Sequence, residues 1–359
     1  DEVARAAESF GVYWDANAGG AVEALPPSSL PPALRFGTLN VDLASLPGGL
    51  PQEPEMREGV PDSIRLPALR LFPGAANLLI ETPAEGRAAA STAIQAAMFR
   101  LLGGLPPGMV RFTIVDPIGL GRGFGAFMHL ADFDEALVNN QVWTDARQIE
   151  ERLGDLESHM ELVTQKYLRN EYASIEAYNA AAGEVAEPYR VLVVVDYPTK
   201  FDEKAASRLA SIVAGGPPCG VLTLIAVDEG REPPAGCRFA DLRPYCTRLV
   251  WKDGGLAWDD PDLGAYPFEP DAPPVGEAAT KLIQRIGAAA KAAKRVEVPF
   301  EFIAPDPESW WAGDSRSGID VPLGKAAASK RQHLALGKGT SQHVLIAGRT
   351  GSGKSTLLH

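Results

Sequence analysis

The chain has 359 residues, of which 45% are hydrophobic and 22% are charged, and these values are typical of a soluble globular protein with about two domains. Its 46 acidic residues outnumber its 34 lysines and arginines, so the net charge of −12 excludes a nucleic-acid-binding surface based on bulk positive charge. No apolar run approaches the roughly 20 residues of a membrane span, and no signal peptide is recognisable. We therefore expect no membrane contact from these residues and cuts in a longer polypeptide at both ends. A cytoplasmic location is expected, with membrane association through sequence upstream of Asp1 as the alternative.

Residues 1–65 are predicted to contain the end of a helix followed by an extended connector. Glu2–Phe10 has a helical pattern, and residues 21–66 are rich in proline and glycine. Leu34–Leu43 is the one strand-like run in this connector. We expect the connector to be ordered only where it packs on the domain that follows.

Residues 66–252 alternate short apolar strands with helices and are predicted to form one domain. Strands are predicted at 77–81, 110–115, 190–195 and 221–227, and helices at 87–102, 147–169 and 203–214. Continuous apolar strands separated by helices are typical of a parallel sheet that is buried on both faces. The predicted fold class is therefore α/β, with a mostly parallel sheet flanked by helices.

Residues 253–310 are predicted to be a linker that contains one helix. A small hairpin at Trp251–Trp258 precedes it, and Glu277–Lys294 has the pattern of an amphipathic helix. The adjacent Trp310 and Trp311 could stack on a base or on a partner, but we favour a role in anchoring the linker. Residues 311–359 are predicted to be the start of a second domain.

The segment Gly348–Thr356, here called the terminal motif, reads GRTGSGKST and fits the phosphate-binding pattern G-x-x-x-x-G-K-[ST]. A buried strand is predicted before it at His343–Ala347, and a helix start after it at Ser355–Leu358. Backbone N–H groups of the motif would cradle phosphates, the lysine would reach the β- and γ-phosphates, and Ser355 would hold Mg²⁺. The predicted ATP-binding residues are Gly348, Arg349, Thr350, Gly351, Ser352, Gly353, Lys354, Ser355 and Thr356.

A second segment, Glu81–Ala88, follows the first strand of the 66–252 domain and has the length of the same motif; we call it the degenerate loop. Gly86 stands at the second glycine of the motif, but Arg87 replaces the lysine and Ala88 replaces the Mg²⁺-binding hydroxyl. Either Glu81 or Thr82 replaces the first glycine. We predict a site that does not support hydrolysis, and a variant nucleotide site that uses Arg87 is the less favoured alternative.

Carboxylates near the degenerate loop also argue against a nucleotide. Glu81 and Glu85 would repel phosphates. Val191–Asp196 has the form of a strand whose terminal aspartate holds Mg²⁺ through water, but Tyr197 follows where a catalytic glutamate would stand. Asp196 is therefore either a relic of metal binding or the cap of the next turn.

The motifs in residues 77–356 together resemble the tandem ATPases of the FtsK/SpoIIIE branch of the HerA/FtsK superfamily. Thr113–Gly121 is similar to the family's Asp-Pro/Phe-Lys strand, with Ile118 in place of the lysine. Ile149–Asn179 is similar to its long helix that ends in R-N-x-x-x-Y-N, and Pro188–Pro198 to its P-Y-hydrophobic-D-E strand. Val321–Thr356 resembles its V-P-L-G strand, hairpin and phosphate loop. The resemblance implies two RecA-like P-loop NTPase domains, the first of them a pseudo-ATPase.

The resemblance further implies ATP and Mg²⁺ as cofactors, a homo-oligomeric ring, hexameric in the family, and translocation of double-stranded DNA by the full-length protein. The first domain would then be structural or regulatory. Coupling ATPases of type VII secretion, which move protein substrates, are the alternative, as is a scaffold or regulatory subunit of an antiphage system. The catalytic residues and arginine finger of the second domain would lie beyond His359, so we expect no ATP hydrolysis by residues 1–359 alone.

Overall fold

The computed structural model describes residues 30–139, 141–169, 171–293, 303–304, 307–309, 312–325, 331–337, 343–348 and 354–358. The chain divides into two compact units, Asp1–Tyr178 with Glu187–Arg295 and Asn179–Ala186 with Val296–His359, and each is described by itself. The predicted helix Glu2–Phe10, together with Trp310 and Trp311, lies outside the described residues.

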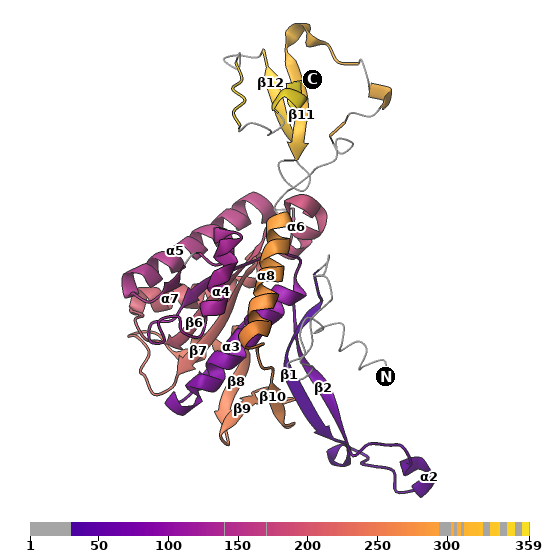
Figure 1. Cartoon of the computed structure of the whole chain (residues 1–359), viewed down its shortest axis with the longest axis vertical. Coiled ribbons are helices and arrows are strands. Elements are labelled where there is room, and N and C mark those ends of the chain that lie inside the picture. The colour runs from indigo at the N-terminus through magenta and orange to yellow at the C-terminus, as the bar shows by residue number, and fades with distance from the viewer. Residues whose placement is uncertain are drawn as a thin grey trace. The chain divides into compact units, whose positions relative to one another are not determined.

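The first unit is built around a seven-stranded sheet with the strand order β5-β4-β6-β7-β3-β8-β9 (Figure 1). Neighbouring strands run parallel except β8 and β9, which form an antiparallel hairpin. The strands are β3 (Leu78–Thr82), β4 (Val110–Val115), β5 (Val142–Trp143), β6 (Tyr189–Tyr197), β7 (Val221–Asp228), β8 (Thr247–Lys252) and β9 (Gly255–Trp258). The predicted α/β fold with a mostly parallel sheet is confirmed.

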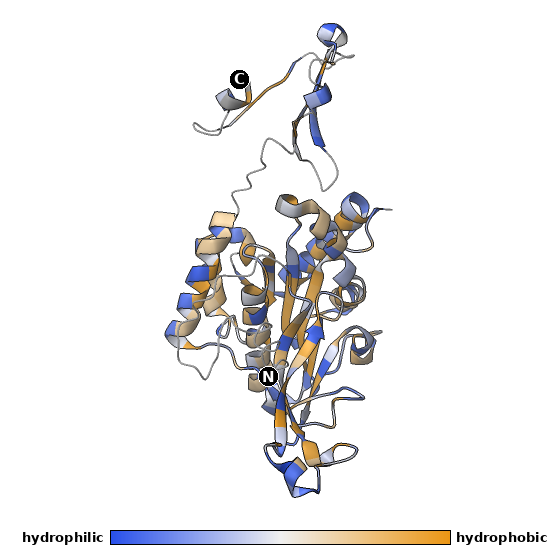
Figure 2. Cartoon of the chain, turned by 90° about the vertical axis from the view of Figure 1, so that its right-hand side faces the viewer, coloured by the Kyte–Doolittle hydropathy of each residue, from blue (hydrophilic) through white to orange (hydrophobic). Residues whose placement is uncertain are grey.

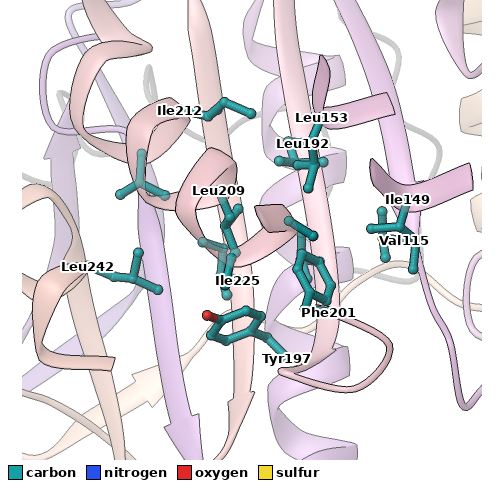
Figure 3. Packing of buried hydrophobic residues seen from close by; sticks show 14 of the residues in the cluster. Val115, Ile149, Leu153, Leu192, Tyr197, Phe201, Leu209, Ile212, Ile225 and Leu242 are labelled. Carbon is teal, nitrogen blue, oxygen red and sulfur yellow. The ribbon is translucent and has the colours of Figure 1, made fainter. Parts of the chain in front are cut away.

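Helices cover both faces of this sheet, as its continuous apolar strands require. α5 (Ala146–Val163) and α7 (Glu203–Gly215) pack on one face, and α3 (Arg87–Gly104) lies on the other (Figure 1). Figure 2 shows the hydrophobic strands enclosed between helices whose outer faces are hydrophilic. Figure 3 shows the core beneath α5 and α7, which includes Val115, Ile149, Leu153, Leu192, Leu209, Ile212 and Ile225.

A further helix, α8 (Gly276–Ala293), packs against α4 (Gly125–Met128) and the turn His129–Asp132. Its apolar stripe is buried, and a Cβ atom added to Gly287 would lie 2.3 Å from the ring of Phe133. The helix predicted in the linker is confirmed as a helix, and it forms part of the first unit. α5 is followed by a π-helical turn, Thr164–Leu168, and then by α6 (Ile175–Ala182).

A three-stranded antiparallel sheet of order β10-β1-β2 completes the first unit. It consists of β1 (Ala33–Asp42), β2 (Ser63–Leu71) and β10 (Phe268–Pro270), and the short helix α2 (Pro54–Arg57) lies between β1 and β2. The strand predicted at Leu34–Leu43 is confirmed as β1. β2 was not predicted, because Pro67 interrupts its pattern, and proline is tolerated here since β2 is an edge strand.

In the second unit, β11 (Ile319–Lys325) and β12 (Arg331–Leu336) form an antiparallel hairpin, and α9 (Lys354–Leu358) follows. The hairpin and the helix start were predicted from the sequence. The predicted buried strand His343–Ala347 is wrong: this segment has no regular secondary structure, and Leu345 is 91% exposed. A strand needs a neighbour to pair with, and none of the described residues pairs with this one. Among the described residues, no helix combines the length and apolar composition needed to cross a bilayer.

Candidate functional site

The degenerate loop lies at the carboxyl edge of the parallel sheet, where α/β proteins bind their ligands. β3 ends at Thr82, a 3-10 turn spans Ala84–Gly86, and α3 begins at Arg87. The N–H groups of Gly86 and Arg87 donate to the carbonyl oxygens of Pro83 and Ala84, and Pro83 has no N–H group. The order of strand, loop and helix is that of a phosphate loop, but these backbone donors are used within the turn.

Arg87 extends from the first residue of α3 to the end of β6, where it meets Asp196. Its Nε and Nη2 atoms donate to the two carboxylate oxygens of Asp196 over 2.5 and 2.7 Å. The Asp196 side chain is 4% exposed, and that of Arg87 is 47% exposed. The hydrogen bond to Asp196 raises the pKa of Arg87, and the charges of Asp196, Asp116 and Asp228 raise it further. Arg87, which replaces the lysine, and Asp196, which stands at the position of the metal-binding aspartate, therefore bind each other.

Glu81 is the second carboxylate at this edge, and it is buried with 1% of its side chain exposed. Arg243 donates to one of its oxygens over 2.8 Å, and Arg248 donates to the other over 3.0 Å. The hydrogen bond to Glu81 also raises the pKa of Arg243. Glu81 was predicted to repel phosphates, but two guanidinium groups neutralise its charge. No sequence pattern indicated that Glu81 binds two arginines, because Arg243 and Arg248 lie more than 160 residues from it.

Gly86, the glycine of the phosphate-binding pattern that the degenerate loop retains, lies against Trp251 of β8. A Cβ atom added to Gly86 would lie 2.7 Å from the indole ring and 2.8 Å from Cβ of Thr82. The indole Nε1 donates to Glu85 over 2.9 Å. The glycine therefore makes room for a tryptophan of the same domain, where an active loop would make room for phosphates.

In the Asp-Pro segment after β4, the carboxylate of Asp116 is also bound by groups of its own loop. The two oxygens of Asp116 accept from the N–H groups of Gly119 and Gly121 over 2.7 and 2.9 Å. A Cβ atom on Gly119 would lie 2.5 Å from Asp116 Oδ2, and Gly121 has a φ of +78°. These glycines allow the loop to close around the aspartate.

The terminal motif is only partly within the described residues. Arg349, Thr350, Gly351, Ser352 and Gly353 lie outside them, whereas Gly348 and the helix that starts at Lys354 lie inside. Lys354 Nζ donates to the carbonyl oxygen of Gly348 over 2.8 Å, so the two ends of the loop meet. An ammonium group beside a helix start with the hydroxyl of Ser355 has the donor chemistry that a Mg²⁺-bound phosphate requires. ATP binding by residues 348–356 stays a prediction.

The two loops therefore differ in their fit to ATP and Mg²⁺. In the degenerate loop Ala88 provides no hydroxyl, and Asp196, the one aspartate at the metal position, is held by Arg87. Within the part of the chain that the structure describes, no three His, Cys, Asp or Glu side chains are grouped to hold a metal ion. The residues of the first unit do not fit a Mg²⁺–nucleotide complex.

No protein-family model and no curated protein sequence matches the chain. Solved structures do match it. EssC (ATPases 2 and 3) from Geobacillus thermodenitrificans is 16% identical with a TM-score of 0.50, covering 93% of this chain and 64% of that one. EccC (ATPases 2 and 3) from Thermomonospora curvata, in complex with a signal sequence peptide, is 17% identical with a TM-score of 0.46 over 87% and 59%. The pCW3 conjugation coupling protein TcpA, with ATPγS, is 12% identical with a TM-score of 0.40 over 65% and 69%.

The chain shares the fold of EssC (ATPases 2 and 3), and the RecA-like ATPase fold that was predicted from the sequence is confirmed. At 16% identity, the similarity to EssC shows the fold alone. The chain spans less than two thirds of that structure, 64% of its length.

Proposed function

We propose that the chain is part of a cytoplasmic, FtsK-like motor ATPase in which the first RecA-like domain does not hydrolyse ATP and the terminal motif belongs to the domain that does. The observation that carries this proposal is the bidentate pair of Arg87 and Asp196. It joins the two positions that an active domain uses for phosphate and Mg²⁺. Residues 66–252 are proposed to form the domain that does not hydrolyse ATP, and residues 311–359 are proposed to form the start of the domain that does.

The chemistry of the active domain is assigned to the terminal motif. Lys354 would neutralise charge on the β- and γ-phosphates, and Ser355 would hold Mg²⁺. The metal would neutralise the charge that develops on the phosphate oxygens during transfer. The Gly348–Gly353 backbone would orient the phosphates, and the rest of the catalytic set would come from residues outside this chain.

Double-stranded DNA is the proposed substrate, pulled through a homo-oligomeric, hexameric ring, because the sequence resembles DNA-translocating members of the FtsK/SpoIIIE branch. The net charge of −12 requires DNA contacts to come from a few loops of the full-length protein rather than from the bulk surface of this chain. A protein substrate is the alternative, and the experiment below separates the two.

The test measures ATP hydrolysis by the full-length protein with and without double-stranded DNA at low salt, where binding to the phosphate backbone is strongest. Lys354→Ala should lower the rate by about 100-fold or more, because it removes a group that stabilises charge in the transition state. Arg87→Met should leave the chemical step intact. Thermal unfolding of both variants controls for folding.

Three results would contradict the proposal. A rate that survives Lys354→Ala but is lost in Arg87→Met would place catalysis in the first domain. A rate that DNA does not raise at low salt would remove DNA as the substrate, and stimulation by a secreted protein would then favour the alternative. Hydrolysis by residues 1–359 alone would also count against the assignment of the missing catalytic groups to other parts of the protein.

A further inference from the structure

Three carboxylates of the first unit lie at the carboxyl ends of neighbouring strands, and the charge of each acts on Arg87. Asp116 follows β4, Asp196 lies in β6 and Asp228 ends β7, and each of them raises the pKa of Arg87 through its negative charge. Asp116 and Asp196 are 3% and 4% exposed. Buried carboxylates are stable in the charged form only when a cation or several donors offset the loss of water.

We infer that Arg87 takes the place of the divalent cation at this edge, so that the first domain is held permanently in a metal-independent state. This inference rests on the proposed function, because it names the interaction that prevents the first domain from hydrolysing ATP. The guanidinium group binds both oxygens of Asp196, and its own backbone is the first residue of α3. It therefore ties α3 to β6, as a metal ion ties the phosphate loop to the aspartate strand of an active P-loop ATPase.

The backbone of Asp196 supports a fixed pairing. Asp196 has a φ of +59° and lies where the register of β6 against β7 shifts, between Val194 and Tyr197. A residue other than glycine keeps such a conformation only when its surroundings hold it there. The two hydrogen bonds from Arg87 are a direct source of that restraint, and they aim the carboxylate at the N-terminus of α3.

Removal of the arginine should leave Asp196 open to a divalent cation. Mg²⁺ and Mn²⁺ bind proteins through one or two carboxylates and keep several waters, so Asp196 alone is a sufficient anchor once its arginine is removed. Arg87→Met keeps the length and apolar stem of the side chain and removes its charge. The variant should lose stability because Asp196 is left buried without a partner, and a divalent cation should restore it.

The experiment compares thermal unfolding midpoints of the 359-residue chain with and without Mn²⁺, and it records bound Mn²⁺ by electron paramagnetic resonance. All proteins carry Ser355→Ala, so that the terminal motif contributes no metal ligand. The unfolding midpoint of Arg87→Met should be lower than that of the protein that keeps Arg87, and Mn²⁺ should raise it again by several degrees. Mn²⁺ should not change the midpoint of Arg87→Lys or of the protein that keeps Arg87. The double variant Arg87→Met, Asp196→Asn should lose the response.

Arg243→Met is the matched control, because it removes an arginine of the same edge from a buried glutamate that keeps Arg248 as a partner. It should show no Mn²⁺ response. A response of Arg87→Met no larger than that of the unsubstituted loop, or one equalled by Arg243→Met, would overturn the inference. If Arg87→Met does not fold without metal, refolding in Mn²⁺ must recover it, and failure to do so is also a refutation.

A separate measurement distinguishes this failure from failure of the proposed function. A fluorescent ATP analogue is titrated with Mg²⁺ into the chain carrying Lys354→Ala and Ser355→Ala. Binding there would show that the first domain takes nucleotide after all, and the proposed function would fall. If the analogue does not bind and Mn²⁺ does not stabilise Arg87→Met, the proposed function stands but the inference on Arg87 fails. The first domain would then lack ATP hydrolysis for a reason other than Arg87.

Discussion

A single histidine shows how the interior of the first unit responds to charge. His159 lies on the buried stripe of α5 with 8% of its surface exposed, and its Nε2 atom has no hydrogen-bond partner among the described residues. Burial, and then the charges of Arg190 and Arg111, lower its pKa from 6.5 to about 4. The two arginines are register partners on β6 and β4, so both face the imidazole from the sheet.

Because the pKa of His159 is lowered in the folded protein, we expect the free energy of unfolding to depend on pH. The unfolded chain binds a proton at His159 near pH 6.5, and the folded protein does so only near pH 4, so the stabilising difference is present above pH 6.5 and is lost as the pH falls. The free energy of unfolding should decrease by roughly 1.4 kcal/mol for each pH unit across this window. Urea unfolding at several pH values measures the slope.

His159→Gln should remove this part of the pH dependence, because glutamine does not titrate. His129→Gln is the control, since His129 is exposed and pairs with the exposed Asp132. Equal slopes for the unsubstituted chain and His159→Gln would show that His159 does not titrate between the folded and unfolded states as argued.

At the scale of elements, one carboxylate connects three of them. Asp271, next to β10, accepts from Arg35 of β1 over 3.1 Å and from Arg100 of α3 over 2.8 Å. Arg100 and Asp271 are 8% and 6% exposed, so this contact is shielded from solvent. The antiparallel sheet and α3 are thus fixed to each other by a buried ion cluster.

Asp271→Asn should therefore destabilise the first unit by about 3–5 kcal/mol, because it leaves the buried guanidinium of Arg100 without its carboxylate. Glu269→Gln is the matched control: Glu269 and Arg65 are each 62% exposed, and the change should cost less than about 1 kcal/mol. Urea unfolding measures both. A cost for Asp271→Asn as small as that of the control would contradict the argument.

Elements with a complete local signal were predictable, and contacts between distant segments were not. The apolar runs of β3, β4, β6 and β7 need both faces covered, so their composition alone indicates the parallel sheet. Pro67 hides the edge strand β2, whose stability comes from pairing with β1. Arg87 was recognised as the replacement of a lysine and Asp196 as the aspartate of a second motif, but their pairing depends on the order in which β3 and β6 enter the sheet.

At the scale of the whole molecule, the first unit reaches beyond the predicted 66–252 domain on both sides. β1 pairs with β2 and β10, and Phe36 contacts Trp258 and Phe268 with ring centroids 5.0 and 5.4 Å apart. α8 buries its apolar stripe on the same unit. The flanking segments therefore contribute buried hydrophobic residues to the core, and residues 66–252 alone lack them.

A fragment of residues 30–293 should consequently unfold in one cooperative thermal transition, whereas a fragment of residues 66–252 should be unstable or aggregate. The shorter fragment exposes the faces that β1, β10 and α8 cover, and it leaves Arg100 without Asp271. Circular dichroism and size-exclusion chromatography compare the two. Equal midpoints for both fragments would show that the flanking elements add nothing to the fold.

The position of β3 also has a consequence for how the chain is made. β3 is the earliest strand of the large sheet in the sequence, yet it lies between β7 and β8, and Leu78 pairs with Leu224 and Thr247. A ribosome must therefore release β3 long before either of its partners exists, and loops of this length make pairing slow. Until β7 emerges, the apolar strand β3 has no partner strand and can associate wrongly, so the growing chain should depend on chaperones during synthesis.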